Sequence, residues 1–331
     1  MDVAALSDLR TTRRLVIKVG SALLVQDGAP RAEWLATLAA EIAELRRSTE
    51  IIVVSSGAIA LGAAKLGLAR GGRGSLADAQ AAASVGQVEL ARLWADALGA
   101  HTITAAQMLV TLGDLEDRRR YLNASATLAR LLEAGALPVV NENDSVATEE
   151  IRFGDNDRLA ARVAQAAGAD AVLLLSDVDG LYDRDPREAD ATLIEQVAGV
   201  TPEIIAMASG DSASGLGSGG MLAKLQAARI AERAGIALAI VNGTHAAPIG
   251  RALDTGVGTL FLPQSDASAR KAWLGGRMAP AGVLSVDAGC AAALDKGASV
   301  LAAGLTAVEG DFGRGDLVAL HGPQGERLGQ G

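Results

Sequence analysis

The sequence is poor in the residues that cross-link chains or hold metals. Its 331 residues include one cysteine, Cys290, which excludes an internal disulfide framework and a four-thiolate metal site. The three histidines, His101, His245 and His321, show no ligand spacing such as H-x-x-x-H, which argues against structural zinc. Aromatic residues make up only 2%, so the core must consist of Ala, Val, Leu and Ile, a composition that suits helices packed closely on a sheet.

The sequence also lacks a basic excess and a long apolar run. Its 30 Lys and Arg against 39 Asp and Glu give a net charge of −9, which argues against general nucleic-acid binding. No apolar run reaches the roughly 20 residues that span a bilayer, and no basic segment followed by an apolar stretch opens the chain as a signal peptide would. We therefore expect a cytoplasmic protein with no membrane partner.

Short apolar runs alternate along the chain with longer helical patterns. The runs are continuously apolar, as parallel strands covered on both faces require, and they fall at 15–19, 51–54, 137–140, 171–175 and 236–241. Helical patterns fall at 33–47, 76–98, 121–133, 158–167 and 222–234. This alternation predicts an α/β domain with a mainly parallel sheet over residues 1–262.

A different pattern begins near residue 263. Short candidate strands at 283–286, 300–301 and 317–320 are separated by glycine turns, which predicts a small β-rich domain over residues 263–331. The final residues are polar Gly and Gln and show no closing strand, so we expect this small domain to be incomplete.

Polar residues follow several predicted strands at the edge where open parallel sheets bind ligands. Lys18 interrupts the first apolar strand and is followed by Gly20, so its ammonium could meet a phosphate; the alternative is an exposed lysine at a sheet edge. Ser56 and Gly57 follow the second strand and precede a helix, where they form either an anion site or an ordinary helix cap.

Two clusters of amides and carboxylates are denser than turns require. Asn141-Glu142-Asn143-Asp144 follows the strand at 137–140, and Gly154-Asp155-Asn156-Asp157 opens the helix at 158–167. Each residue alone could serve a turn. Together they indicate a polar pocket able to hold an amino-acid ammonium, with acid–base catalysis and metal binding left open.

Two later segments indicate a nucleotide. Ser176 and Asp177 end the most apolar strand and lead to Tyr182, which could form a shelf for a base or ribose or could simply pack in the core. Gly215, Gly217 and Gly220 match G-x-G-x-x-G, but no strand precedes them and no acidic residue ends the next strand, so a dinucleotide fingerprint is rejected. The loop still offers free amides and Lys224 one helical turn on, which suits a phosphate unless the loop is only a linker.

Taken in order, these motifs resemble those of the glutamate 5-kinases in the amino-acid kinase family, over roughly residues 13–262. Asn-Glu-Asn-Asp followed by Gly-Asp-Asn-Asp separates these enzymes from aspartate, acetylglutamate, carbamate and uridylate kinases. The segments that carry the resemblance are Lys18-Val19-Gly20-Ser21, Val54-Ser55-Ser56-Gly57-Ala58, 141–144, 154–157, Asp179-Gly180-Leu181-Tyr182 with Asp185-Pro186, and 217–224.

The resemblance implies a three-layer α/β/α fold and transfer of phosphate from ATP, with Mg²⁺, to the γ-carboxylate of L-glutamate, the first step of proline biosynthesis. It further implies feedback inhibition by proline, a dimer or tetramer, and a glutamyl phosphate reductase that receives the product. The implied catalytic residues are Lys18, Asp157 and Lys224. The implied substrate-binding residues are Ser56, Gly57, Asn141, Asp144 and Asn156. The implied nucleotide-binding residues are Lys18, Gly20, Ser176, Asp177, Tyr182, Ser218, Gly219, Gly220, Met221, Leu222, Ala223 and Lys224.

This chain departs from the family pattern at two places. Leu222 and Ala223 stand where a hydroxyl residue commonly precedes the lysine, so one side-chain contact to phosphate is absent. The C-terminal region resembles the beginning of a PUA domain, a domain with which other proteins bind RNA.

Three functions other than that of a glutamate 5-kinase stay open from the sequence. They are another carboxylate or carbamate kinase of this fold, a nucleotide- or amino-acid-binding sensor without catalysis, and an RNA-binding accessory protein.

Overall fold

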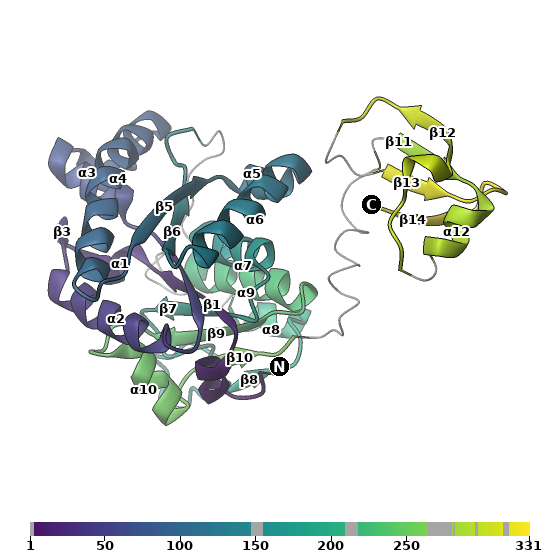
Figure 1. Cartoon of the computed structure of the whole chain (residues 1–331). Helices are drawn as coiled ribbons and strands as arrows, with labels where there is room; N and C mark the ends of the chain where they lie inside the picture. The colour runs from purple at the N-terminus through teal and green to yellow at the C-terminus, as the bar shows by residue number, and fades with distance from the viewer. Residues whose placement is uncertain are drawn as a thin grey trace.

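A computed structural model describes residues 3–146, 155–208, 218–263, 280, 282–294, 297–313 and 318–331. Its larger part is a sheet in the order β5-β6-β4-β1-β7-β9-β10-β8 (Figure 1). All neighbours are parallel except β9 and β10. The strands are β1 (Arg14–Val19), β4 (Glu50–Ser55), β5 (Ala105–Val110), β6 (Leu137–Glu142), β7 (Ala171–Ser176), β8 (Gln196–Val197), β9 (Ala237–Asn242) and β10 (Thr259–Phe261).

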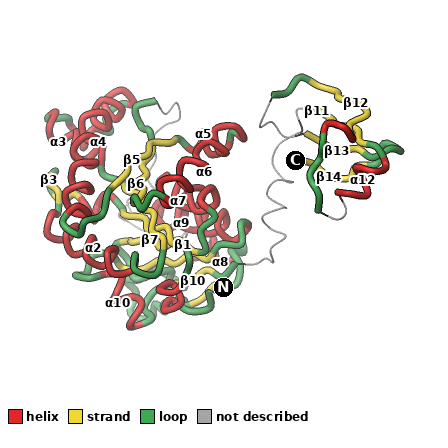
Figure 2. The backbone as a smooth tube through the Cα atoms, viewed as in Figure 1, coloured by secondary structure: helices red, strands yellow, loops and turns green. Residues whose placement is uncertain are grey.

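Helices cover both faces of this sheet, which gives three layers (Figure 2). On one side lie α1 (Ser21–Leu24), α2 (Ala32–Leu45), α3 (Ala58–Leu66), α4 (Leu76–Gly99) and α10 (Pro248–Thr255). On the other lie α5 (Leu112–Glu116), α6 (Arg118–Glu133), α7 (Asp155–Ala167), α8 (Pro202–Met207) and α9 (Ser218–Arg233). The hairpin of β2 (Val25–Gln26) and β3 (Ala29–Pro30) and the short 3-10 turns η1 (Leu6–Thr11) and η2 (Ala69–Gly72) complete this part.

The two apolar cores follow from the alternation of side chains along the strands. In β1, Leu15 and Ile17 join the core beneath α2 and α4, whereas Val16 joins the core beneath α7 and α9. Because side chains two residues apart share a face of a strand, Lys18 lies on the same side as Val16. The expected parallel strands and the five expected helices are confirmed, each within a few residues of its predicted bounds.

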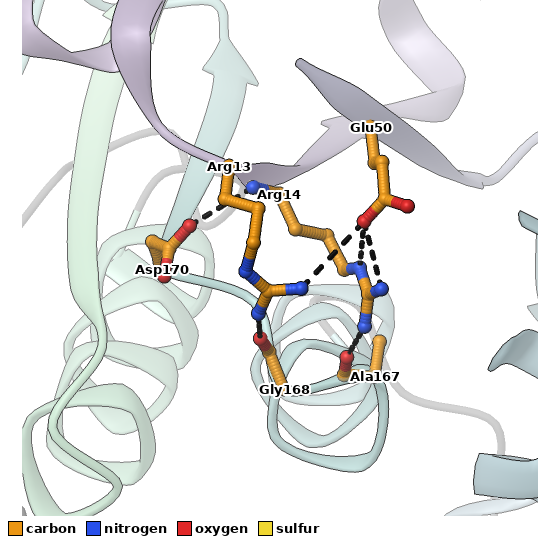
Figure 3. Close-up of polar contacts among 6 residues, drawn as sticks. All are labelled: Arg13, Arg14, Glu50, Ala167, Gly168 and Asp170. Atoms are coloured by element: carbon orange, nitrogen blue, oxygen red, sulfur yellow. Dashed lines mark hydrogen bonds and ion pairs between the residues drawn. The ribbon is translucent and has the colours of Figure 1, made fainter.

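At the amino-terminal edge of the sheet, a polar cluster ties three elements together (Figure 3). Arg14 donates to the Glu50 carboxylate at 2.7 and 2.9 Å and also to the carbonyl of Ala167, at the end of α7. Arg13 donates to the carbonyl of Gly168 at 2.8 Å. The two arginines thus satisfy carbonyls at the end of α7, where the helix dipole favours positive charge. The described residues of the predicted polar clusters, 141–144 and 155–157, belong to the opposite, carboxyl-terminal edge of the sheet.

The C-terminal part forms a second, mixed sheet in the order β12-β11-β13-β14. Its elements are β11 (Gly282–Val286), α12 (Ala288–Leu294), η3 (Ala302–Gly304), β12 (Leu305–Gly310), β13 (Val318–His321) and β14 (Arg327–Gln330). Two expectations were wrong. Residues 300–301 lie in a loop before η3. The polar end does form a closing strand, because β14 pairs with β13 through backbone groups that need no apolar side chain.

In the described part of the chain, none of the helices combines the length and the apolar character needed to cross a bilayer.

Candidate active site

Three charged side chains from separate elements meet at the carboxyl edge of the sheet. Lys18 comes from β1, Asp157 from the first turn of α7 and Lys224 from α9. Asp157 lies between the lysines, with Oδ1 2.5 Å from Lys18 Nζ and Oδ2 3.1 Å from Lys224 Nζ. The side chains of Asp157 and Lys18 are 1% and 7% exposed. The structure therefore brings the three predicted catalytic residues together.

Burial and mutual attraction act in opposite directions on these charges. Burial lowers the pKa of Lys18, an effect that the neighbouring Lys224 ammonium increases and the Asp157 carboxylate opposes. Burial alone would raise the pKa of Asp157, but the two ammonium groups outweigh it and hold that pKa below its ordinary value. With both lysines protonated and Asp157 ionised, this group carries two positive charges and one negative charge, so it attracts an anion.

A second group, made of amides and a hydroxyl, adjoins the first because Asn156 directly precedes Asp157. Asn156 Nδ2 donates to Ser56 Oγ at 2.7 Å and to Asn141 Oδ1 at 3.2 Å. Asn141, only 2% exposed, donates through Nδ2 to Gln87 Oε1 at 2.8 Å. The ends of β4 and β6 and the start of α7 thus meet here, and Gln87 of α4 completes the group.

Gly57 directly follows Ser56 in the chain, and Asp144 lies three residues after Asn141. Gly57 precedes α3 with a φ of 122°, a conformation that favours glycine, and a Cβ there would lie 3.1 Å from Leu24 Cδ2. Asp144 follows β6, is 8% exposed and interacts electrostatically with Arg73. A buried carboxylate close in the chain to hydrogen-bonding amides suits a ligand that carries both an ammonium and a carboxylate.

The ends of β7 and β9 form the third part of this edge. Ser176 is buried and its Oγ donates to Asp177 Oδ1 at 3.2 Å, while the exposed Asp177 carboxylate acts electrostatically on Lys18. Tyr182 is half-buried, and its hydroxyl donates to Asp179 Oδ2 at 3.3 Å. Burial and the Asp179 charge raise the pKa of Tyr182. Its ring therefore does not lie deep in the core.

Two of the predicted glycines, Gly20 and Gly220, lie near the lysines. A Cβ on Gly20 would lie 3.7 Å from Lys18 Nζ. On α9, Lys224 Nζ also reaches the carbonyl of Gly220 at 3.5 Å. Met221 is half-buried, Leu222 is 37% exposed and Ala223 is buried, and the helix itself begins at Ser218. Gly154, Gly215 and Gly217 lie outside the described residues.

Sequence reasoning missed Gln87, Asp179 and Asn242 as members of this edge. Asn242 Nδ2 donates to Asp179 Oδ1 at 2.9 Å, and this bond joins the ends of β9 and β7. In the sequence, Asp179 stands out only as part of the Asp-Gly-Leu-Tyr motif, and Asn242 lies one residue after the predicted strand at 236–241. For Gln87 the available signal was a glycine followed by an uncharged polar residue inside an alanine-rich helix, which indicates a close contact.

Comparison with known proteins agrees with this geometry. The model of the amino acid kinase family matches residues 13–242, and the model of the PUA domain matches residues 282–331. A glutamate 5-kinase from Novosphingobium aromaticivorans is 67% identical over 99% of this chain and 88% of its own length. Glutamate 5-kinases from Sphingopyxis alaskensis and Zymomonas mobilis are 59% and 56% identical over 96% and 93% of this chain, and over 86% and 78% of their own lengths.

Solved structures show the same fold at low sequence identity. UMP kinase from Ureaplasma parvum is 18% identical, with a TM-score of 0.50 over 76% of this chain and 98% of its own. An isopentenyl phosphate kinase is 19% identical, with a TM-score of 0.50 over 75% of this chain and 99% of its own. From the family models and the curated relatives together, this chain belongs to the amino acid kinase family, among its glutamate 5-kinases, and carries a PUA domain.

Proposed function

We propose that this protein transfers the γ-phosphoryl group of ATP to the γ-carboxylate of L-glutamate, giving L-glutamyl 5-phosphate and ADP. The observation that carries the proposal is the buried Lys18–Asp157–Lys224 group beside a pocket of amides. In this reaction a carboxylate oxygen bonds to the γ-phosphorus while the bond from that phosphorus to the β,γ-bridging oxygen breaks. The substrate carboxylate is itself the nucleophile, so no covalent enzyme intermediate is needed.

Catalysis then depends on positioning and on charge. Negative charge is spread over the transferring phosphoryl oxygens and the ADP leaving group, and two fixed ammonium groups stabilise it without reorganisation. Asp157 holds Lys18 and Lys224 at 2.5 and 3.1 Å and so fixes where these charges lie. Because both carboxylate oxygens are engaged by lysines and its pKa is lowered, Asp157 suits an orienting role better than that of a proton acceptor.

The amide group suits the amino-acid end of glutamate. We assign Ser56, Asn141 and Asn156 to this pocket, with Asp144 attracting the ammonium and Gly57 allowing close approach. Asn156 directly precedes Asp157 in the chain, and Ser56 is hydrogen-bonded to Asn156. A glutamate held by these residues would therefore have its γ-carboxylate within reach of the lysines that Asp157 holds. Held in this way, the two reactants meet without the entropic cost of a free encounter.

The nucleotide is assigned to the ends of β1 and β7 and to the start of α9. The first turn of α9 offers free backbone amides to phosphate oxygens, and these amides serve where Leu222 and Ala223 supply no hydroxyl. The assigned residues are Lys18, Gly20, Ser176, Asp177, Tyr182 and the segment 218–224.

Mg²⁺ suits this site as a companion of ATP. Among the described residues no group of three Asp, Glu, His or Cys side chains gathers as a metal cage. Mg²⁺ commonly keeps its waters and binds through nucleotide phosphates with one or two carboxylates, and the exposed Asp177 is one such carboxylate. When bound, the ion would neutralise phosphate charge.

Membership among the glutamate 5-kinases supports four further proposals: a cytoplasmic location, a dimer or tetramer, inhibition by proline, and delivery of the labile acyl phosphate to a glutamyl phosphate reductase. It also supports a division of the chain into a kinase domain, 1–262, and a PUA domain, 263–331. The last strand of the large sheet, β10, ends at Phe261, close to that boundary.

The test is ADP release from ATP and Mg²⁺ with glutamate, compared with aspartate, acetylglutamate and carbamate, with hydroxylamine present to trap an acyl phosphate. We expect glutamate-dependent ADP release and a hydroxamate. Turnover with another substrate would retain the roles of the lysines and discard glutamate. A folded protein that binds ATP but turns over none of the four would be a sensor rather than a kinase.

A further inference from the structure

Helices α3 and α4 approach each other more closely than side chains normally allow. A Cβ on Gly86 of α4 would lie 1.8 Å from the carbonyl oxygen of Ala58, and a Cβ on Gly62 of α3 would lie 1.8 Å from that of Ala82. Only glycine fits at both positions. Because Ala58 directly follows Ser56-Gly57, this contact brings the residue after Gly86 to the amide pocket.

That residue, Gln87, begins a chain of hydrogen bonds with a defined direction. Gln87 Oε1 accepts from Asn141 Nδ2, and Asn141 Oδ1 accepts from Asn156 Nδ2. An amide offers an oxygen that accepts and an NH₂ group that donates. Once Gln87 presents its oxygen, each following amide must turn the same way for both bonds to form.

The chain ends on an atom that is buried and unused. Asn156 Oδ1 is shielded from solvent and, among the residues that the structure describes, it has no hydrogen-bond partner. A buried acceptor without a hydrogen bond destabilises the folded protein. At neutral pH both carboxylates of glutamate only accept hydrogen bonds, and its sole donor is the α-ammonium.

We infer that Gln87 is a positioning residue for the amino-acid substrate: through Asn141 it orients Asn156 so that Oδ1 accepts a hydrogen bond from the substrate ammonium. The inference rests on the proposed function and adds to it a residue that does not itself touch the substrate. It also gives the α4 glycine contact a functional purpose, since that contact sets the position of Gln87.

Two substitutions at position 87 distinguish the effect of the hydrogen-bond direction from the effect of side-chain size. Gln87→Glu keeps the shape of the side chain and can only accept, so it preserves the direction of the chain. Gln87→Met keeps a similar length but offers no comparable acceptor, so Asn141 loses the bond that orients it. Asn156 then keeps its bond to Ser56 Oγ, but a hydroxyl can accept or donate and so does not fix the direction of the Asn156 amide. We expect Gln87→Met to raise the KM for glutamate about tenfold or more, as the loss of a hydrogen bond to a charged group implies. Gln87→Glu should restore most of this loss.

The KM for ATP and the thermal midpoint provide the controls, and both should stay close to wild type in the two variants. Val88→Met places a methionine at the adjacent, 73% exposed position of the same helix and should change neither KM. If Gln87→Met binds glutamate as wild type does, or if Gln87→Glu is impaired as strongly as Gln87→Met, the inference is wrong. Strong impairment of Gln87→Glu would mean that Gln87 donates its NH₂ group to Asn141, so that donor and acceptor are reversed at each amide. Absence of glutamate turnover in the wild type would instead refute the proposed function.

Discussion

At the scale of single residues, the site depends on one carboxylate shared by two ammonium groups. Removing either lysine leaves Asp157 paired with the other, so no buried carboxylate is left without a cation. Removing the carboxylate instead leaves two buried ammonium groups facing each other, which is far more costly. The three residues should therefore respond differently to substitution, although all three serve one purpose.

The first prediction concerns Lys224→Met, which removes the charge and keeps most of the bulk. We expect kcat to fall about 10²- to 10³-fold, the usual effect of losing one preorganised group that stabilises transition-state charge. The thermal midpoint should change little. Steady-state kinetics and thermal unfolding check both, with Lys65→Met as the control, because Lys65 is a 52% exposed lysine that also pairs with a carboxylate. Unfolding of Lys224→Met would make Lys224 a structural residue.

The second prediction concerns the pH dependence of nucleotide binding. The pKa of Lys18 lies below the ordinary lysine value of 10.5 because of burial. As pH rises through this lowered pKa, Lys18 loses its charge, so affinity for ATP should fall at a pH below 10.5. Calorimetric titration with ATP across this range measures the loss. Lys18→Arg provides the control, because a guanidinium stays charged throughout. An affinity that stays constant up to pH 10.5, or an equal decline in Lys18→Arg, would exclude Lys18 as the titrating group.

At the scale of helices and strands, the contact between α3 and α4 determines the geometry of the pocket. It fixes the start of α3, which carries Ser56 and Gly57 just before it, against the middle of α4. The contact forms backbone to backbone, so it tolerates no side chain at Gly62 or Gly86.

The third prediction is that Gly86→Ala destabilises the protein by about 1–3 kcal/mol, as expected when a group is forced into a filled space. The KM for glutamate should rise as well, because the added methyl group pushes α4, and Gln87 with it, away from the pocket. Urea unfolding and kinetics test this. Gly99→Ala is the matched control: Gly99 ends the same helix with open space around it, and alanine there should be neutral or slightly stabilising. Equal stability of the two variants would contradict the close contact.

Elements with a strong local signal could be predicted from the sequence, and those whose signal depends on tertiary contacts could not. Strand β7 (Ala171–Ser176) is buried throughout, and its residues 171–175 were predicted as a strand from their continuous apolarity. The edge strand β5 (Ala105–Val110) was missed because it is half-buried and contains alanine and glutamine, so it shows neither a continuous run nor a clear alternation. Lys18 was found because a charge interrupts an apolar strand. Gln87 was missed because its one local signal, the preceding glycine in an alanine-rich helix, indicates a close helix contact but does not show that this contact borders a pocket.

At the scale of the whole molecule, the buried residues of the two apolar cores of the large sheet all lie between Val3 and Phe261, among the residues that the structure describes. Every residue assigned to the substrate or to ATP also lies in this part of the chain. The PUA domain has its own hydrogen-bonded sheet, β12-β11-β13-β14. The described residues of the kinase part therefore hold both apolar cores and every residue assigned to the site.

The last prediction follows from this separation. A chain that ends at Pro263 should fold, keep its thermal midpoint within a few degrees, and phosphorylate glutamate with kcat and both KM values within about twofold of the full chain, because it keeps every buried residue that the described part of the chain contributes to the two cores. Parallel assays of the two chains with hydroxylamine trapping, together with thermal unfolding, provide the measurement. A soluble short chain with a much lower kcat would show that the PUA domain acts on the active site. An insoluble one would mean that it covers apolar surface of the kinase part, and the proposed division near residue 262 would then not separate independent units.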